Sequence, residues 1–482
     1  MTLPLYPSLQ TNAVILAFAL LYGCAINPVS GDREFVLVSE SQEIAMGADG
    51  AESVRRSVGL VGDEAVQTYV HGLGTNLAGD SERPHLPWSF TVLDDPTPNA
   101  FAFPGGYIFV TRGLMALMCN EAELVSVLGH EIGHVTARHS VAMISRAQVA
   151  QIGLGVGSII SPELAQFGEA AASGLSLLFL SYSRDAERQA DDLGFRYALD
   201  HGYDVREMVD VFASLQQAGE AAGVSALPNW LASHPEPAER IERIEARLAG
   251  LEDALGGSRV GQDDYMGYID GMLYGANPRH GYFEDNVFLH PDMAFQLTFP
   301  EGWRTRNLPQ IVLAGSPNQD ALVQLTMAAG TPTEAAGHFF AQQGMEAAGV
   351  GPKSINGLPA VQGRFEVQLQ GGRIGGMAAF VAHGENTYRL LAFAPAQQLN
   401  GYAPVFQKTI GSFARLTDRK ALGTQPDRLS IVRVDRAMTL ASFADEFPSV
   451  IDTERLAMIN QLAGPDAAIP AGTPVKRVVR GQ

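Results

Sequence analysis

The pattern His-Glu-x-x-His, formed by His130, Glu131 and His134, constrains the fold of this chain more than any other sequence feature. Asn120 and Glu123 form a capping-box pattern ahead of it, and a run of helix-forming residues follows. We therefore predict a helix that begins near residue 120 and carries the pattern on its third and fourth turns. Positions i and i+4 lie about 40° apart around a helix, so both imidazoles face the same way.

Two imidazoles on one helix face can bind a single Zn²⁺ ion. Glu131 is turned about 100° from His130, so its carboxylate lies outside the ligand face but within reach of a metal-bound water. The metal lowers the pKa of that water toward about 7, and a neighbouring carboxylate can take its proton and later pass it to a leaving amine. An ordinary amphipathic helix with two surface histidines is the alternative, but Leu128 and Ile132 would bury the helix.

A catalytic zinc needs a third protein ligand and an open fourth position. Glu187, in a charged stretch far beyond His134, is the candidate that we favour, and it must come from a second helix. Asp191 is at i+4 from Glu187 and shares its helix face, where it can accept a hydrogen bond from a ligand histidine and orient the ring. Asp185 and Asp192 are the rival carboxylates, and a solvated charged helix is the alternative for the whole stretch.

These segments resemble peptidase family M48, the gluzincin metallopeptidases of bacterial envelopes and of the membrane CAAX proteases. The resemblance is carried by HEIGH at 130–134 and SRDAERQAD at 183–191, with further similarity at 24–47 and 99–110. It covers residues 24–250, about half of the chain. The fold that it implies is a mainly α zincin-type peptidase domain with a small β-sheet edge.

The resemblance also implies a role for each matching residue. One Zn²⁺ per chain would be bound by His130, His134 and Glu187, with Glu131 as the catalytic base and Asp191 in support. His139 follows His134 after five positions, about 140° from the ligand face, and we predict that it is structural.

A second group of candidate residues lies at Ser233-His234-Pro235 and Arg240. His234 precedes a proline and is expected outside a helix, whereas Arg240 falls in the next helix and is expected to pair with a carboxylate near the site. Family M48 carries a His-Pro pair and an Arg here, and in some envelope members this histidine approaches the metal and holds the enzyme latent. Two roles are therefore open for His234, stabilising the tetrahedral oxyanion or blocking the fourth coordination position, and a loop histidine without a role is the third reading.

A β-favouring stretch at 107–111 precedes the predicted helix and follows Pro104-Gly105-Gly106. An exposed strand edge beside the zinc could accept an extended peptide and present its scissile carbonyl to the metal. We therefore predict substrate-binding residues here, with a plain structural hairpin as the alternative. They are Gly106, Tyr107, Ile108 and Phe109.

The N-terminal residues 1–23 contain no charged side chain, and their apolar run at 13–21 is nine residues long. Such a run is too short to cross about 30 Å of hydrocarbon and is typical of a secretory signal peptide. The residues up to Cys24 resemble a bacterial lipobox, in which the cysteine is lipidated; a core-packed cysteine is the alternative. Lipidation implies a membrane anchor on the periplasmic side of the envelope, and Ala25 implies the outer membrane.

The second half of the chain shows a different pattern. Residues 251–281 are rich in Gly and Asp and are predicted to be a connector, after which apolar and polar residues alternate as in strands. Residues 282–417 are predicted to form an α+β domain and resemble PsbP-like domains. Residues 427–480 resemble a LysM-type βααβ module, a class that binds peptidoglycan.

The net charge of −19 disfavours nucleic acid as a partner, because the chain should repel phosphate backbones. We predict a membrane-tethered zinc metalloendopeptidase that hydrolyses damaged or misassembled envelope proteins, with peptidoglycan or envelope-protein contacts through the C-terminal regions. The alternative is a latent, non-proteolytic assembly factor or chaperone for outer-membrane proteins or the cell wall. A cell-wall-binding enzyme that acts on peptide stems is a third reading.

Overall fold

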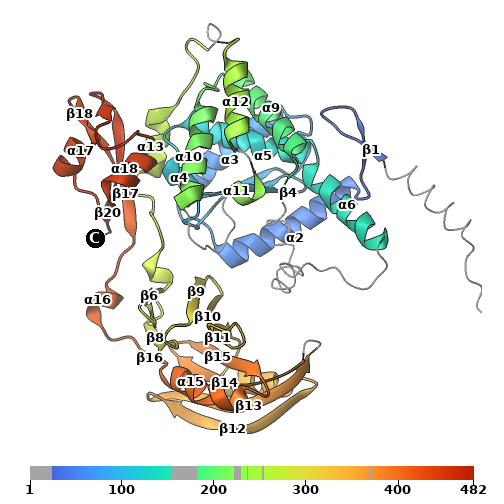
Figure 1. Cartoon of the computed structure of the whole chain (residues 1–482), viewed down its shortest axis with the longest axis vertical. Coiled ribbons are helices and arrows are strands. Elements are labelled where there is room, and N and C mark those ends of the chain that lie inside the picture. Colours follow the sequence, from blue (N-terminus) through green and yellow to red (C-terminus); the bar gives the residue numbers. More distant parts are fainter. Residues whose placement is uncertain are drawn as a thin grey trace, which may run out of the picture. The chain divides into compact units, whose positions relative to one another are not determined.

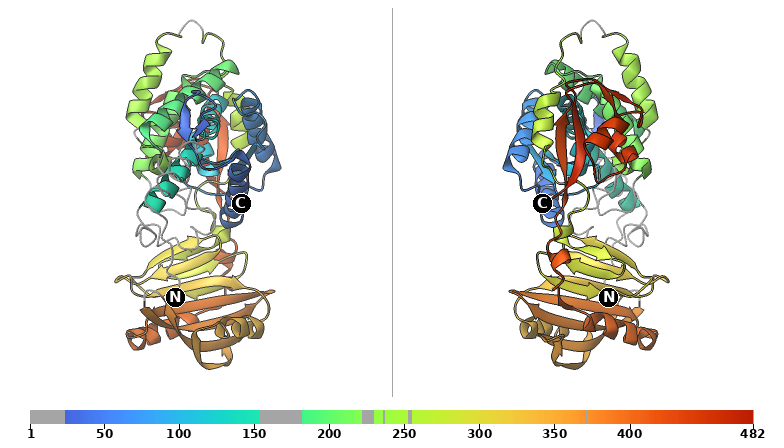
Figure 2. Two further views of the ribbon diagram at one scale, coloured as in Figure 1. Left: turned by 90° about the vertical axis from the view of Figure 1, so that its right-hand side faces the viewer. Right: turned by 90° about the vertical axis from the view of Figure 1, so that its left-hand side faces the viewer.

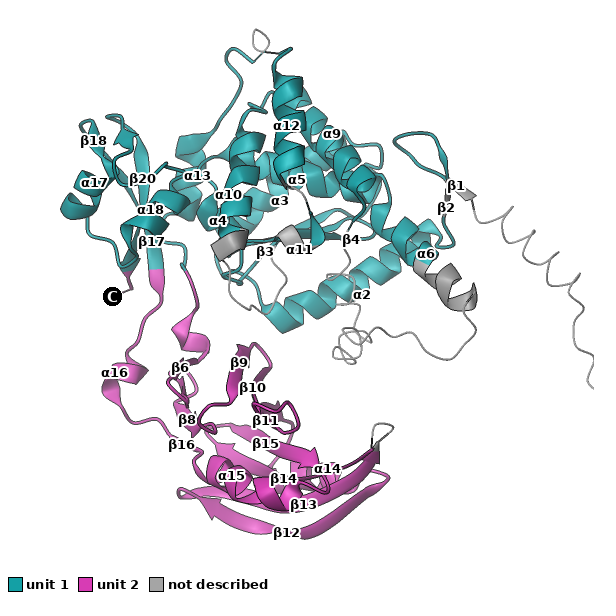
Figure 3. Ribbon diagram, viewed as in Figure 1, with its two compact units in different colours: residues 1–274, 428–479 teal, residues 275–427, 480–482 magenta. Residues whose placement is uncertain are grey.

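The computed structural model describes residues 24–153, 182–221, 230–235, 237–251, 255–369 and 372–481. The chain divides into two compact units, of which unit 1 comprises residues 1–274 and 428–479 and unit 2 comprises residues 275–427 and 480–482 (Figure 3). The predicted signal peptide, 1–23, lies outside the described residues. None of the described helices has the length and apolar character that crossing a bilayer requires.

Unit 1 is mainly helical, and its helices surround α5 (Figure 1). The described helices of this unit are α2 (Glu40–Val58), α3 (Glu64–Gly79), α4 (Arg112–Leu117), α5 (Glu121–Thr136), α6 (His139–Gly153), α9 (Arg184–Asp200), α10 (Glu207–Ala221), α11 (Trp230–Ser233), α12 (Pro237–Leu248) and α13 (Gln262–Ile269). Strands β1 (Cys24–Ile26) and β2 (Arg33–Phe35) form a separate antiparallel pair.

Helix α5 begins where the capping pattern predicted. The Asn120 side chain accepts a hydrogen bond from the Glu123 backbone N–H at 2.9 Å, which satisfies one of the free donors of the first turn. Every residue of α5 is buried, because α3, α9, α10 and the strands of a small sheet all contact it. Burial on all sides makes α5 the central element of the unit and holds its side chains in place.

Helices α5 and α9 approach each other backbone to backbone. A Cβ built on Gly133 of α5 would lie 3.1 Å from the Cα of Ala190 on α9, and one on Gly129 would lie 3.0 Å from the Cα of Gly194. Larger side chains at these positions would push the helices apart. The close crossing brings the acidic face of α9 against the two histidines of α5.

The small sheet of unit 1 contains β3 (Ser89–Leu93), β4 (Ala100–Phe103) and β5 (Tyr107–Thr111) in the order β3-β5-β4. Strand β5 is central, since it pairs parallel with β3 and antiparallel with β4. The prediction that the strand of Gly106, Tyr107, Ile108 and Phe109 offers an exposed edge to substrate is therefore wrong. Both of its edges are paired within the sheet, and β4 is the edge strand that contacts α5.

The C-terminal part of unit 1 has two helices between two pairs of strands. It comprises β17 (Asp427–Arg433), β18 (Met438–Thr439), α17 (Leu440–Glu446), α18 (Thr453–Ile459), β19 (Ala468–Ile469) and β20 (Pro474–Arg480), with β17 paired to β20 and β18 to β19. Figure 2 shows this part in orange and red against the helices of unit 1.

This C-terminal part is built into unit 1 and does not form a unit of its own. Phe443 and Ile459 belong to the same buried apolar cluster as Leu114 of α4. The ammonium group of Lys476 is fully buried and donates hydrogen bonds to the carbonyls of residues 116, 117 and 118 at 2.8–3.3 Å. Lys476 therefore satisfies the free carbonyls at the end of α4, just before α5 begins.

Unit 2 is rich in strands, and the prediction of a sheet-rich region after a helical domain is confirmed. A seven-stranded sheet has the order β12-β13-β14-β15-β11-β10-β9, and a four-stranded sheet has the order β16-β8-β7-β6. The strands are β6 (Tyr282–Glu284), β7 (Val287–His290), β8 (Phe295–Thr298), β9 (Arg304–Leu308), β10 (Ile311–Gly315), β11 (Leu322–Ala328), β12 (Met345–Ile355), β13 (Leu358–Leu369), β14 (Gly372–His383), β15 (Asn386–Pro395) and β16 (Ala414–Arg415).

Helices α14 (Pro332–Phe340) and α15 (Leu399–Gly411) supply the apolar contacts of two different clusters in unit 2. Phe339 of α14 packs with Phe365 and Phe380, whereas Phe406 and Ile410 of α15 belong to the second cluster. The short helices η2 (Pro278–His280) and α16 (Arg419–Leu422) complete the described elements of unit 2.

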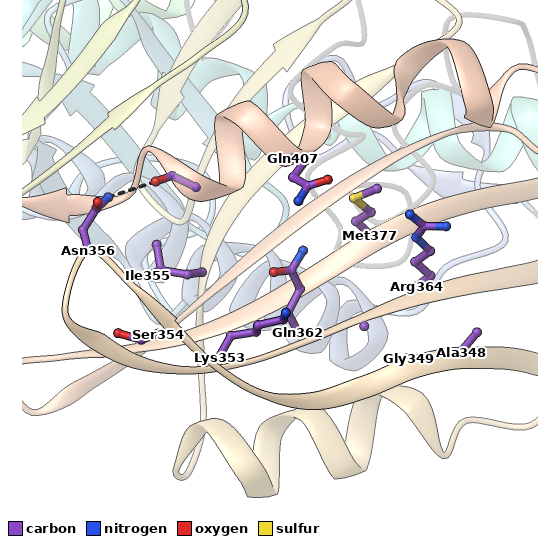
Figure 4. Close-up of a pocket in the computed structure, with 12 residues that line it drawn as sticks. Ala348, Gly349, Lys353, Ser354, Ile355, Asn356, Gln362, Arg364, Met377 and Gln407 are labelled. Atoms are coloured by element: carbon purple, nitrogen blue, oxygen red, sulfur yellow. Dashed lines mark hydrogen bonds between the residues drawn. The ribbon is translucent and has the colours of Figure 1, made fainter.

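A groove of about 650 Å³ lies in unit 2 between the β12–β13 hairpin and α15. The strands supply Lys353, Gln362 and Arg364, and the helix supplies Gln407 (Figure 4). Asn356, in the hairpin turn, donates a hydrogen bond to a backbone carbonyl at the end of α15 at 2.9 Å and so ties the turn to the helix.

Candidate metal centre

Four buried side chains converge in unit 1. His130 and His134 come from α5, Glu187 from the first turn of α9, and His234 follows α11; each offers one ligand atom, and these atoms lie within 4.8 Å of one another. The Nε2 atoms of His130 and His134 are 3.0 Å apart, and the Glu187 carboxylate lies 3.7 and 3.5 Å from them. The structure thus brings together the three predicted ligands and adds His234 to them.

His234 is not an unattached loop residue. Its Nδ1 lies 3.0 Å from the Glu187 carboxylate and 3.3 Å from His130 Nε2. The imidazole is almost completely buried and stacks on the ring of Trp230, with ring centres 4.8 Å apart. It therefore occupies the side of the cluster that neither α5 nor α9 supplies.

Glu131 lies beside the cluster without a hydrogen-bond partner. Both of its carboxylate oxygens are buried, and among the described residues neither makes a hydrogen bond; His234 Nε2 lies 3.5 Å from Oε1. Burial raises the pKa of Glu131, against the charges of His234 and His130, which lower it. A buried carboxylate without a partner is energetically unfavourable, so we infer that the Glu131 carboxylate interacts with a bound group that the protein itself does not supply.

The donor set fits a zinc ion. Imidazole nitrogens and a carboxylate oxygen are ordinary zinc ligands, and the ligand atoms converge from different elements on one point. His134 has its pKa lowered well below the ordinary value, first by burial and then by the neighbouring histidines, so its ring is neutral as ligation requires. The orphaned carboxylate of Glu131 beside these ligands also suits a catalytic centre, where a base is needed next to the metal.

Asp191 and Arg240 contact the ligands His130 and Glu187 and each other. The Asp191 carboxylate lies 3.0 Å from His130 Nδ1, and Arg240 donates to both of its oxygens at 2.6 and 2.8 Å. Arg240 also lies 3.0 Å from the Glu187 carboxylate. Burial alone would raise the pKa of Asp191, but the charge of Arg240 and the hydrogen bonds from His130 and Arg240 bring it well below its usual range.

Two aromatic rings hold the Arg240 guanidinium in place. Its central carbon lies 4.3 Å from the ring centre of Phe212 and 4.6 Å from that of Trp230. Such contacts with a ring face are favourable for a desolvated cation. A buried positive charge therefore sits at a fixed place between the carboxylates of Asp191 and Glu187.

Tyr182 is a contact of the cluster that the sequence analysis missed. Its ring stacks on His134, with ring centres 3.9 Å apart, and its hydroxyl lies 2.8 Å from the Ser140 hydroxyl. Burial raises the pKa of Tyr182. The sequence contains a signal for this contact: Tyr182 directly precedes Ser183, the N-cap residue of α9, and α9 is the helix that carries Glu187.

His139, predicted to be structural and to lie off the ligand face, contacts a ligand histidine. Its Nδ1 lies 2.9 Å from His134 Nδ1, and its Nε2 lies 2.9 Å from Gln189 Oε1. The helical angle of about 140° does not apply because α5 ends at Thr136 and Arg138 adopts a φ of +60°, which interrupts the helix before α6 begins. The His139 ring therefore contacts the side of His134 that faces away from the cluster.

A buried metal-binding cluster on a helix with the His-Glu-x-x-His pattern, completed by a glutamate from a second helix, defines a zincin-type metallopeptidase. Residues 64–248 match the model of peptidase family M48, and all four residues of the metal-binding cluster lie within this match. The resemblance seen in the sequence is thereby confirmed, as is zinc as the cofactor of the family.

Curated relatives agree with this assignment. The chain is 31% identical over 255 residues to a beta-barrel assembly-enhancing protease of Yersinia pestis, with 51% of each chain covered. It is 30% identical over 222 residues to the protein of the same name from Escherichia coli K12, with 44% of this chain and 45% of the relative covered. The mitochondrial metalloendopeptidase OMA1 of Schizosaccharomyces pombe is 28% identical over 266 residues, which cover 50% of this chain and 76% of the relative.

The chain spans about half the length of the bacterial relatives that it matches. Among solved structures, cyanobacterial PsbP from Synechocystis sp. PCC 6803 aligns with 28% of this chain and 94% of its own, at 11% identity and a TM-score of 0.24.

Proposed function

We propose that this chain is a zinc metalloendopeptidase that hydrolyses peptide bonds in proteins of the bacterial cell envelope. The observation that carries the proposal is the Glu131 carboxylate, which is buried beside three convergent ligands and has no hydrogen-bond partner among the described residues. A scaffold protein that only binds metal has no use for such a group. A hydrolase needs it to move a proton.

His130, His134 and Glu187 would hold the ion. When bound, zinc supplies a Lewis acid that polarises the scissile carbonyl and lowers the pKa of a water molecule. Glu131 would accept the proton of the attacking water on a carboxylate oxygen and donate it to the leaving amine. Burial raises the pKa of Glu131, which brings its two protonation states closer in free energy and suits it to both steps.

Asp191 and Arg240 would act through the ligands. Asp191 accepts the N–H of His130, which leaves Nε2 of that ring free to bind the ion. Arg240 neutralises Asp191 and lies beside Glu187, so the buried carboxylates remain charged in the absence of solvent. Both residues position the ligands and do not take part in the reaction itself.

His234 is proposed to control the fourth coordination position. Its contacts with Glu187 and His130 favour the role in which it binds the ion at rest and blocks water or substrate. Its proximity to Glu131 leaves the oxyanion-stabilising role available once it moves. The variant His234→Ala separates them: cleavage increases if the histidine blocks the site, and kcat falls if it stabilises the oxyanion.

An extended substrate is proposed to bind along β4. This strand is the edge of the small sheet, it contacts α5, and it pairs with β5 alone in the part of the chain that the structure describes. A peptide that adds to a free strand edge gains main-chain hydrogen bonds and presents its carbonyls at regular intervals. Residues 100–103 thereby replace the predicted strand as the candidate substrate platform.

The envelope location rests on the bacterial relatives and on the sequence. Two relatives are named as beta-barrel assembly-enhancing proteases, which favours envelope proteins as substrates here. Lipidation of Cys24, attachment to the outer membrane and contact with peptidoglycan through the C-terminal regions stay predictions. Mass spectrometry of the mature N-terminus from membranes tests the first: a lipid-modified cysteine supports it, and an unmodified N-terminus contradicts it.

A digest of casein and of an unfolded outer-membrane protein tests the peptidase function. Purified wild-type protein should cleave, and Glu131→Gln should not, although both contain one zinc per chain. One zinc per chain with no cleavage by wild type or by His234→Ala, on several substrates, would favour the alternative of a non-proteolytic assembly factor.

A further inference from the structure

The two ligand histidines of α5 are oriented in the same way. Their Nε2 atoms face each other at 3.0 Å, and each Nδ1 points away from the cluster. His130 Nδ1 meets the carboxylate of Asp191 at 3.0 Å, whereas His134 Nδ1 meets Nδ1 of His139 at 2.9 Å. Each ligand ring therefore has one partner behind it, but the partner of His134 is a second imidazole.

The direction of these hydrogen bonds follows from ligation. A neutral imidazole that binds a metal through Nε2 carries its proton on Nδ1, so His134 must be the donor to His139. His139 Nδ1 then has no proton, and its own N–H lies on Nε2, where Gln189 Oε1 accepts it at 2.9 Å. The bonds run in one direction, from His134 through His139 to Gln189.

The fold buries the two imidazoles of this chain of hydrogen bonds, and Gln189 at its end is half-buried. His139 is only 8% exposed, and the left-handed residue Arg138 is what returns it toward α5. Gln189 lies on α9, two positions after Glu187, so one helix supplies both the third ligand and the acceptor that ends the chain of bonds. If the bonds ran the other way, the proton of His134 would lie on Nε2 and would prevent ligation.

We propose that His139 is a positioning residue for the metal centre: it accepts the Nδ1–H of His134, and Gln189 in turn fixes the tautomer of His139. This places His134 Nε2, unprotonated and correctly oriented, toward the ion. The inference depends on the zinc binding that the proposed function includes, but not on peptide hydrolysis.

The variant His139→Phe tests the proposal, because it keeps a planar ring and removes the acceptor. The zinc dissociation constant, measured against a competing chelator, should rise about 10- to 100-fold. The visible absorption of the cobalt-substituted protein should change as well, since the geometry of one ligand is altered. His338→Phe makes the same substitution at an exposed histidine of unit 2 and should leave both measurements at the wild-type values.

The conservative variant His139→Gln retains an oxygen acceptor and should restore most of the zinc affinity. A folded His139→Phe, as judged by circular dichroism and thermal unfolding of the apoprotein, that binds zinc within twofold of wild type and gives the wild-type cobalt spectrum would overturn the proposal. If His139→Phe does not fold, Gln189→Leu removes only the final acceptor: a several-fold weaker zinc affinity is expected, and an unchanged one would overturn the proposal. Wild-type protein that binds zinc but cleaves nothing would refute the peptidase function and leave this inference standing.

Discussion

Gly194 lies against the backbone of His130, so closely that a Cβ added to the glycine would be 2.7 Å from the backbone nitrogen of His130. The ligand glutamate sits on the same helix as Gly194, and the two histidines sit on the helix that it touches. The distance between Glu187 and the histidines therefore depends on the absence of one side chain.

The variant Gly194→Ala is expected to separate the two helices. The free energy of unfolding should fall by about 1–3 kcal/mol, because the new methyl group meets backbone atoms that cannot move independently. Zinc content should fall too, since Glu187 moves with α9. Gly72→Ala is the control: it lies in helix α3 with open space around it and should be neutral or stabilising by up to about 1 kcal/mol. Equal stability and zinc content in Gly194→Ala and wild type would contradict the prediction.

Arg240 is expected to be needed for stability as well as for zinc binding. Removing it in Arg240→Met leaves Asp191 and Glu187 buried without their cation, and breaking a buried pair in this way typically lowers the free energy of unfolding by about 3–5 kcal/mol. Urea unfolding provides the measurement. Arg243→Met is a matched control on the same helix, since Arg243 is 36% exposed and its surface pair with Asp192 should be worth at most about 1 kcal/mol. If both variants lost a similar free energy of unfolding, the buried ion pairs of Arg240 would contribute no more to stability than the surface pair of Arg243.

Lys476 is expected to stabilise the packing of the C-terminal part of unit 1 against the end of α4, just before α5 begins. The variant Lys476→Met keeps most of the apolar stem but removes the ammonium donor from three carbonyls at the end of α4, of which that of Leu117 still accepts a hydrogen bond from Gln461 at 3.3 Å. The free energy of unfolding should therefore fall by about 2–4 kcal/mol. Limited proteolysis should then release a C-terminal fragment sooner than in wild type. Lys408→Met, at an exposed position of α15, should change neither measurement. Wild-type resistance in Lys476→Met would mean that the C-terminal part is held by its apolar contacts alone.

The stability of unit 2 is expected to fall on acidification because of His290. Burial lowers the pKa of His290 to about 4, whereas an unfolded histidine titrates near about 6.5. The unfolded state therefore binds more protons between these values, and stability is lost as the pH falls from about 6.5 toward 4, by about 1–3 kcal/mol for this partly exposed group. Hydrogen exchange of β7 peptides at pH 4.5 and 7 should show the loss in wild type and less of it in His290→Phe. An equal pH effect in both proteins would assign it to other groups.

The parts of the site that depend on local spacing could be predicted from the sequence. The i to i+4 spacing of His130 and His134 and that of Glu187 and Asp191 each define one helix face, and Asn120 marks where α5 begins. The convergence of the two faces could be expected only through resemblance to a family. Nothing in the spacing itself says that Gly133 and Gly194 set how closely the helices pack.

The errors have physical causes that a sequence pattern does not contain. β-favouring residues indicated the strand of Tyr107 but not its place in the sheet, and the order β3-β5-β4 makes it central. The position of His139 depended on a left-handed turn at Arg138, which is a conformation that arginine seldom adopts. Lys476 was not singled out because lysine is almost never fully buried.

Anomalous diffraction at the zinc absorption edge, from crystals of the zinc-loaded protein, would show directly where the ion binds. A single strong peak is expected about 2.0–2.2 Å from His130 Nε2, His134 Nε2 and a carboxylate oxygen of Glu187, with Glu131 beside it. A peak bound by other residues, or these three side chains turned apart with no peak among them, would contradict this assignment of the ligands.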